Sequence, residues 1–108
     1  MKNPAEIFKA LSDETRLKIM ILLTGRELCV CDLERILATT QTKISRHLST
    51  LKYNKLVKSR REGQWSYYSL AEINDEFTRS IINSFAFIKE QYFPDFDQII
   101  NDLTKCVK

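Results

Sequence analysis

Glycine, proline and histidine are scarce in this chain, with two, two and one respectively among 108 residues. We find no low-complexity segment, internal repeat or flexible linker, so we expect a single domain over residues 1–108. No stretch approaches the roughly 20 consecutive apolar residues that cross a bilayer, and the first residues lack the apolar core of a signal peptide. We therefore expect a cytoplasmic protein with no membrane partner.

The chain has three cysteines, Cys29, Cys31 and Cys106. An odd number of cysteines in a reducing compartment argues against a disulfide framework and favours thiol chemistry or metal ligation. The spacing is not that of paired zinc knuckles, so a structural zinc site is not expected.

The net charge of +3 conceals an uneven distribution along the chain. Residues 41–68 hold one acidic residue, Glu62, against seven basic residues: Lys43, Arg46, Lys52, Lys55, Lys58, Arg60 and Arg61. Residues 72–102 hold seven acidic residues against two basic ones, Arg79 and Lys89. One end of the folded chain is thus expected to suit phosphate, and the other is not.

Helical spacing of apolar residues dominates the first half of the chain. With the capping residues around them, these patterns predict helices at about 4–11, 13–24, 31–38 and 41–54. A tight polar turn joins the third of these helices to the fourth. Two short helices joined in this way are typical of a helix-turn-helix.

The second half of the chain begins with alternating β-rich residues at 55–70, which predict a hairpin with a basic tip around Glu62 and Gly63. A long amphipathic helix at 77–92, ended by Pro94, and a last helix that holds Cys106 follow. The expected fold is mainly α with a small β-hairpin, and the hairpin is the wing of a winged helix-turn-helix.

The segment TQTKISRHLSTL has an apolar face for the core and a polar, basic face that suits the major groove. Gln41 suits adenine and Arg46 guanine, whereas Lys43 and the hairpin arginines suit phosphate. For His47 a role in DNA binding or packing fits better than ligation. A solvated surface has the same composition, but the order of the elements favours operator double-stranded DNA. The residues expected to meet DNA are Gln41, Thr42, Lys43, Ser45, Arg46, His47, Arg60 and Arg61.

One module of this size buries a limited area of DNA, and specific affinity usually requires two half-sites read by a two-fold dimer. Phe77, Phe85, Phe87 and Tyr92 supply more aromatic surface than one flank of a small core needs. We expect the N- and C-terminal helices to form a homodimer interface. The alternative is that this aromatic stripe packs only within the subunit.

Cys29 and Cys31 are separated by one residue, and positions i and i+2 of a regular helix lie about 200° apart. Both thiolates reach one soft ion only if they precede the third helix or distort its first turn. Ion capture is then expected to strain the start of that helix and to misplace the recognition helix. Cys106 is expected to complete a three-sulfur metal site, within the subunit or across the dimer. The alternatives are two buried, inert thiols and a free cysteine at position 106.

Four segments resemble the ArsR/SmtB family of metal-responsive repressors: ALSDETRLKIMILL, ELCVCDLERIL, ISRHLSTLK and EGQWSYYSL. ELCVCDL resembles the metalloid-binding box of the arsenic-responsive members, and it is also present in cadmium and lead sensors. The resemblance implies a dimeric winged helix that represses transcription and is derepressed by ligand. By position, Cys29 and Cys31 match the inducer-binding cysteines. The positions that match the recognition helix are Gln41, Thr42, Ser45 and Arg46.

The fullest arsenic box has a third cysteine three residues after the second, and Glu34 stands there in this chain. A hard carboxylate does not replace a thiolate for As(III). Either two sulfurs suffice for As(III), or Cys106 supplies the third, or the inducer is Sb(III), Cd(II) or Pb(II). The family's zinc sensors use carboxylate and histidine ligands on the dimer helix, and no histidine follows His47. The resemblance implies no required cofactor beyond the inducer.

Two rival functions fit parts of the sequence. In a thiol switch, oxidation or persulfidation that links Cys29 or Cys31 to Cys106 replaces ion capture as the signal. A small thiol reductase would need an activated nucleophile with a base or a redox partner, and the chain offers neither a CxxC motif nor a spare histidine. We therefore expect a repressor and not an enzyme.

Overall fold

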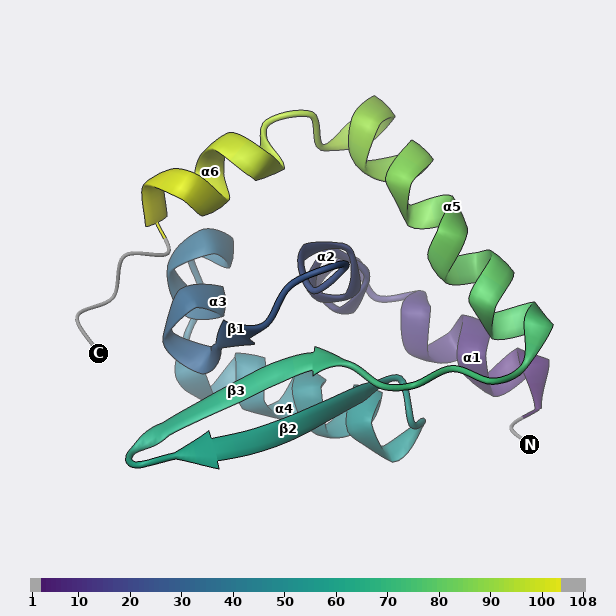
Figure 1. Cartoon of the computed structure of the whole chain (residues 1–108), viewed down its shortest axis with the longest axis horizontal. Coiled ribbons are helices and arrows are strands. Elements are labelled where there is room, and N and C mark those ends of the chain that lie inside the picture. Colours follow the sequence, from purple (N-terminus) through teal and green to yellow (C-terminus); the bar gives the residue numbers. More distant parts are fainter. Residues whose placement is uncertain (1–2, 104–108) are drawn as a thin grey trace.

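The computed structural model describes residues 3–103, which form six helices and three strands. In chain order these are α1 (Pro4–Leu11), α2 (Glu14–Leu22), β1 (Leu28–Cys29), α3 (Val30–Leu37), α4 (Gln41–Tyr53), β2 (Val57–Glu62), β3 (Trp65–Leu70), α5 (Glu76–Tyr92) and α6 (Phe96–Leu103). In Figure 1, α5 and α6 arch over α2, and the β2–β3 hairpin lies on the other side of it. The architecture is mainly helical with a small sheet, as predicted.

Polar side chains determine where four of the helices begin. Asn3, Asp13, Thr40 and Asp75 precede α1, α2, α4 and α5, and each accepts a backbone N–H from the first turn at 2.8–3.3 Å. Such caps satisfy donors that have no partner within the helix. Because the capping signal is local, the predicted starts of these helices agree with the observed ones to within one or two residues.

The sheet is antiparallel with the strand order β1-β3-β2. Strands β2 and β3 are the predicted wing, and Gly63 adopts a left-handed φ of 61° in the turn between them. Strand β1 was not predicted, and it pairs Leu28 with Tyr68 and Cys29 with Tyr67. A strand of two residues has no alternating pattern, so the sequence alone does not indicate it.

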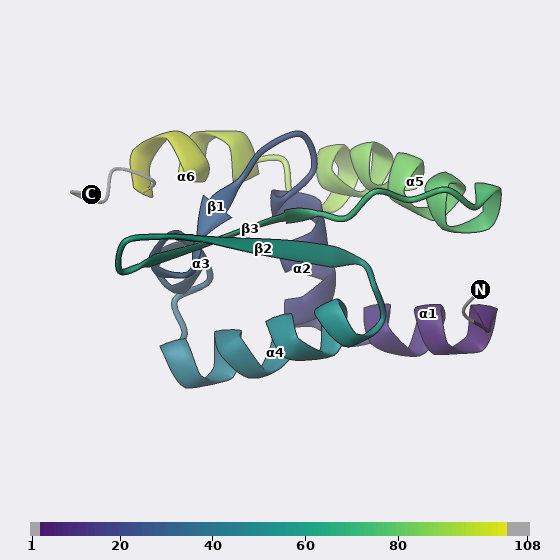
Figure 2. The same cartoon turned by 60° about the horizontal axis from the view of Figure 1, so that its bottom comes forward.

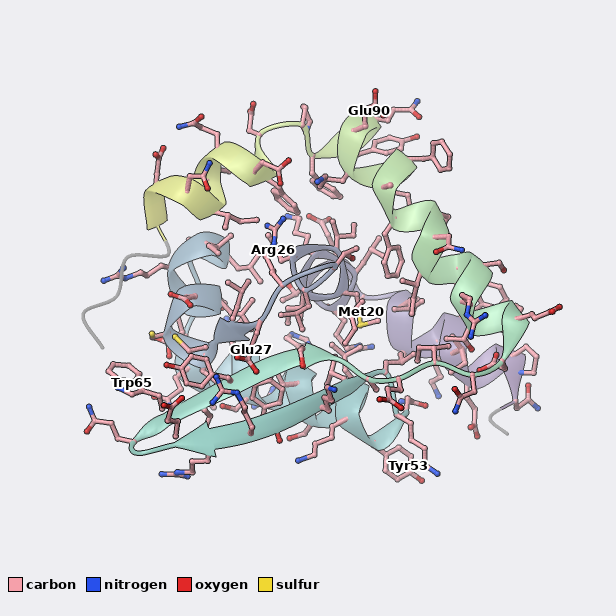
Figure 3. All side chains as sticks on the ribbon, viewed as in Figure 1. Met20, Arg26, Glu27, Tyr53, Trp65 and Glu90 are labelled. Carbon is pink, nitrogen blue, oxygen red and sulfur yellow. The ribbon has the colours of Figure 1, made fainter. Side chains whose placement is uncertain are left out.

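The core surrounds α2, where Figure 3 shows Met20 near the centre of the molecule. Its least exposed aliphatic and sulfur side chains, at 0–1% exposure, include Ile19, Met20, Leu22, Leu33, Ile44, Leu48 and Leu51. Three of these lie at i, i+4 and i+7 of α4, which confirms the predicted inner face of that helix. Burial of each such side chain stabilises the fold by about 1.5–3 kcal/mol. The inner face of α4 thus fixes the helix against the core, and its outer face keeps a fixed orientation.

The aromatic residues predicted to form a dimer stripe occupy different environments. Phe85 is 1% exposed and belongs to the core of its own subunit, which corrects the prediction for this residue. Phe77 contacts Phe8 edge to face, with the ring centroids 5.4 Å apart. Phe87 and Tyr92 remain exposed, at 73% and 67%. Phe85 differs from Phe87 and Tyr92 because it lies on the side of α5 that packs against the core.

The last helix, α6, covers α3 in Figure 1 and buries Phe96 and Ile100. Figure 2 shows α4 on one side of α2, with α5 and α6 on the opposite side. This arrangement separates the basic recognition segment from the acidic C-terminal helices. Cys106, which was predicted to lie on the last helix, falls outside the described residues. Within the described part of the chain, no helix has the length and apolar character needed to cross a membrane.

Candidate functional site

Cys29 and Cys31 lie where strand β1 passes into α3. Cys29 is the residue before the helix, with an extended backbone (φ −84°, ψ 163°), and Cys31 is in the first helical turn. One potential ligand atom from each of Cys29, Cys31 and Asp32 lies within 4.8 Å of the others. The extended residue therefore allows two side chains at i and i+2 to meet, because a regular helix would direct them apart. The helix begins at Val30, one residue before its predicted start.

The same cysteine caps the helix. Cys29 Sγ accepts the Asp32 backbone N–H at 3.4 Å, and Asp32 Oδ2 accepts the Cys29 backbone N–H at 3.2 Å. This reciprocal pair is a capping box in which a thiol replaces the usual hydroxyl. Both residues are buried, at 0% and 1% exposure. Asp32 was not among the predicted site residues, although an acidic residue three positions after a cap is the signal for a capping box.

A hollow opens beside Cys31, between α3, the start of α4 and the turn of the wing. Its lining residues are Val30, Cys31, Glu34, Gln41, Gln64, Trp65 and Ser66. Figure 3 shows Trp65 at the turn end of the wing. Cys31 is partly exposed whereas Cys29 is buried, so a solute reaches the pair from the side of Cys31. One hollow is thus lined by the cysteine site, the start of the recognition helix and the turn of the wing.

The outer face of α4 carries five of the residues predicted to contact DNA, and all of them are exposed: Gln41, Thr42, Lys43, Ser45 and Arg46. The turn before α4 contains Ala38 in a left-handed conformation, with a φ of 51°. Figure 2 shows α4 at the edge of the molecule, with α2 on one side of it and no other element on its outer side. The geometry of α3, turn and α4 is that of a helix-turn-helix with an accessible second helix.

His47 faces inward from the same helix. Its side chain is 20% exposed, and Nδ1 lies 3.3 Å from Arg16 Nη1 and 3.8 Å from Asp13 Oδ2. The pKa of Asp13 is lowered from its ordinary value, first because its carboxylate accepts the Arg16 backbone N–H and then by the nearby charges of His47 and Arg16. His47 therefore joins the recognition helix to the start of α2, which supports the packing alternative over a DNA contact.

The two wing arginines have different surroundings. Arg60 donates from Nε and Nη2 to the two carboxylate oxygens of Glu27 at 2.8 and 2.7 Å, and from Nη1 to Glu62 at 2.8 Å. Its guanidinium also lies 4.5 Å from the centroid of the Tyr67 ring. These carboxylates raise the pKa of Arg60 above its ordinary value, with Glu27 as the main cause. Arg61 is exposed and has no carboxylate contact of this kind among the ion pairs of residues 3–103.

Glu27, labelled above β3 in Figure 3, is a second site residue that was not predicted. It lies 33 positions before Arg60 in the chain. No local pattern connects residues at that separation, because only the pairing of β1 with the wing brings them together.

The family described as bacterial regulatory protein, arsR family, matches residues 13–59. A cadmium resistance transcriptional regulatory protein CadC homolog from Staphylococcus aureus is 41% identical over 94 residues, which cover 83% of this chain and 74% of that protein. The arsenic resistance transcriptional regulator ArsR2 from Pseudomonas putida is 49% identical over 71 residues, which cover 65% of this chain. The match spans 62% of the length of that regulator, less than two thirds.

A solved structure shares the fold. The homodimeric winged helix-turn-helix DNA-binding domain (fragment 1–100) from Mycobacterium bovis, a possible ArsR-family transcriptional regulator, is 31% identical to this chain. The two superpose with a TM-score of 0.64 over 80% of this chain and 74% of that one. The predicted architecture of helix-turn-helix and wing is thereby confirmed.

Proposed function

Because the chain belongs to the ArsR family of bacterial regulatory proteins, we propose that it is a homodimeric repressor that releases operator DNA on binding trivalent arsenic. Proteins of this family are DNA-binding regulators and not enzymes, so no residue is assigned a catalytic role. As a regulator of transcription it acts in the cytoplasm, where the chromosome lies. The observation that carries the proposal is the pair of cysteines at the start of the helix-turn-helix.

The DNA surface consists of the outer face of α4 and the wing. The exposed polar residues of α4 enter the major groove, where Gln41 and Arg46 have the donors and acceptors that read base edges. Lys43 and Arg61 neutralise phosphates on either side. The buried leucine and isoleucine side chains of α4 fix the helix against the core. Contact between its outer face and the bases therefore does not require the helix to fold on binding.

The dimer is proposed to form through α1 and α5. Phe8, Phe87 and Tyr92 are exposed on these helices at 57%, 73% and 67%. Tyr92 also lines an apolar groove with Leu17. Exposed aromatic side chains on both helices, one of them in such a groove, favour a partner surface, and a second copy is the partner that two operator half-sites require. The homodimeric relative from M. bovis supports the same choice.

The inducer site is proposed to be formed by the thiolates of Cys29 and Cys31. The ligand atoms of the two cysteines lie within 4.8 Å of one another. Both thiolates would therefore hold one soft ion after only a small movement of their side chains. Each thiol that bonds to As(OH)3 replaces one hydroxide, which leaves with the thiol proton as water. Two such steps leave one hydroxide on arsenic, at the position that the predicted third ligand, Cys106, would take.

Release follows from the second role of Cys29. Its sulfur caps the Asp32 N–H, and a sulfur bonded to an ion is drawn away from that donor. The start of α3 then loses this capping hydrogen bond. Such a cap stabilises a helix by about 1 kcal/mol. Because α3 and α4 form one unit, the recognition helix is displaced relative to the wing. Linkage requires bound DNA to weaken ion binding by the same factor.

A second candidate inducer is Cd(II) or Pb(II). The buried carboxylate of Asp32 lies within 4.8 Å of both thiols, and an oxygen ligand suits these ions better than it suits As(III). The S. aureus relative is named for cadmium resistance, and the P. putida relative for arsenic. Sb(III) shares the chemistry of As(III) and is expected to act with it.

The test is fluorescence anisotropy of the protein's own promoter DNA with reduced protein, titrated with As(III), Sb(III), Cd(II) and Pb(II). Cys29→Ser and Cys31→Ser are expected to bind DNA and to keep it in the presence of As(III). Cys106→Ser decides whether that cysteine is a third ligand. A tenfold or larger loss of As(III) response in this third variant would assign it to the site.

Different outcomes overturn different parts of the proposal. Failure of every ion to release wild-type DNA, together with release by an oxidant or polysulfide, would replace ion sensing with a thiol switch. Release by Cd(II) or Pb(II) but not by As(III) would keep the site and change the inducer. Absence of DNA binding by the reduced wild-type protein would refute the repressor itself.

A further inference from the structure

Arg60 lies in the wing but faces away from the recognition helix. Side chains alternate between the two faces of a strand, so Ser59 and Arg61 share one face of β2 and Arg60 lies on the other. Ser59 Oγ accepts a hydrogen bond from Lys52 Nζ of α4 at 2.8 Å, which identifies its face as the one turned toward the recognition helix. Arg61 is therefore on the DNA side of the wing, and Arg60 is on the opposite side.

The surroundings of Arg60 also disfavour a phosphate contact. All three guanidinium nitrogens donate to carboxylate oxygens, two of them to Glu27 and one to Glu62. Two carboxylates carry more negative charge than one guanidinium neutralises, so an approaching phosphate is repelled. The guanidinium forms two hydrogen bonds with the carboxylate of Glu27 and lies over the ring of Tyr67. Both contacts depend on the planar, forked guanidinium, which lysine lacks.

The contacts of Arg60 lead back to the cysteine site. Glu27 is two residues before Cys29 on the same segment, and Tyr67 pairs with Cys29 on one side and with Arg60 on the other. We propose that Arg60 is a positioning residue that ties the wing to the cysteine-bearing strand through Glu27, and that Arg61 rather than Arg60 is the wing's phosphate contact. This inference rests on the proposed function.

The physical consequence concerns how the wing responds to the inducer. Strand β1 pairs with β3 through two residues only, so backbone pairing alone holds the wing weakly to it. The Glu27–Arg60 pair adds a two-bond contact that crosses from this segment to β2. When ion capture shifts Cys29, the pair transmits the shift to the wing. Loss of the pair is expected to leave DNA affinity in the absence of ion nearly intact and to reduce the inducer's effect.

The variant Arg60→Lys distinguishes a positioning role of Arg60 through Glu27 from a role in phosphate binding. Lysine keeps the positive charge and binds phosphate as a point charge, but it cannot reproduce the paired bonds to Glu27. Glu27→Gln removes the other partner. If Arg60 bound phosphate, Arg60→Lys would behave as wild type, and Glu27→Gln would free the guanidinium and tighten DNA binding. The matched pair for the salt slope is Arg60→Gln and Arg61→Gln, which remove one positive charge from each face of β2.

The experiment measures the dissociation constant for promoter DNA by anisotropy at several salt concentrations, with and without As(III) and Cd(II). Arg61→Gln is expected to lower the salt slope by about 0.9 for each bound subunit. Arg60→Lys and Glu27→Gln are expected to keep the wild-type slope and to lower the inducer's fold-effect on DNA affinity by about 3- to 10-fold. The double variant should lower it no further than either single variant.

Hydrogen exchange of the wing amides gives a readout that does not require DNA. As(III), or Cd(II) if that is the ion that releases the DNA, is expected to change exchange in β2 and β3 of the wild type and not of Arg60→Lys. An equal change in both proteins, or a loss of salt slope in Arg60→Gln equal to that in Arg61→Gln, would overturn the inference. Failure of the wild type to bind DNA or to respond to any ion in the anisotropy test would instead refute the proposed function.

Discussion

Replacement of Asp32 by alanine removes the carboxylate that accepts the Cys29 N–H at the start of α3. Both residues are almost fully buried, so water cannot replace the lost acceptor. A buried donor left without a partner costs about 1–3 kcal/mol, and loss of an acidic group from the first turn of a helix costs a further 0.3–1 kcal/mol or so. We therefore expect Asp32→Ala to lower the free energy of unfolding by about 2–3 kcal/mol.

Asp32→Asn is the informative partner of this variant. Asparagine keeps an oxygen that accepts the Cys29 N–H and removes only the charge, so a loss of about 0.5–1 kcal/mol is expected. Asp102→Ala replaces an exposed aspartate on α6 and should change the free energy by less than about 0.5 kcal/mol. The assay is urea unfolding of the three variants and the wild type at one protein concentration, because association of subunits contributes to apparent stability.

Two results would refute this account of the helix start. A loss below about 1 kcal/mol in Asp32→Ala would show that the carboxylate does not hold the first turn. Equal losses in Asp32→Ala and Asp32→Asn would show that charge, and not the hydrogen bond, is what stabilises it. The expected loss is smaller than the 5–15 kcal/mol or so of a typical domain, so the variant is expected to fold and remain measurable.

Three further predictions concern the recognition helix, the dimer and the docking of α6. Thr40→Ala removes the cap of α4 and should lower the free energy of unfolding in urea by about 1 kcal/mol; no change would show that the cap does not stabilise the helix. Phe87→Lys should shift the protein from dimer to monomer in analytical ultracentrifugation, whereas Tyr53→Lys, at an exposed aromatic residue of α4, should not. The pKa of Asp97 is lowered from 3.8, first by its hydrogen bond from Lys89, so this contact stabilises the fold fully above pH 3.8 and is lost as the pH falls below that value. Asp97→Asn should therefore make the melting temperature less dependent on pH below 3.8, and an unchanged acid dependence would contradict the assignment.

Several features of this protein follow from the sequence by itself. Capping residues and apolar residues at helical spacing are separated by only a few positions, so the starts of the helices and the inner face of α4 are predictable. The prediction that Cys29 and Cys31 precede the third helix or distort its first turn also follows from helical geometry alone. The structure shows Cys29 in extended backbone immediately before α3, and Cys31 in the first turn of that helix.

The tertiary structure decided what the predicted residues face. Arg60 and His47 belong to the segments predicted to bind DNA, yet one contacts Glu27 and the other lies beside Arg16, residues that are 33 and 31 positions away. Phe85 fits an aromatic interface by composition, and it packs in the core because of its position around α5. The sequence pattern within an element shows which side chains share a face. Which other element covers that face depends on contacts between residues far apart in the chain, and these form only when the whole domain folds.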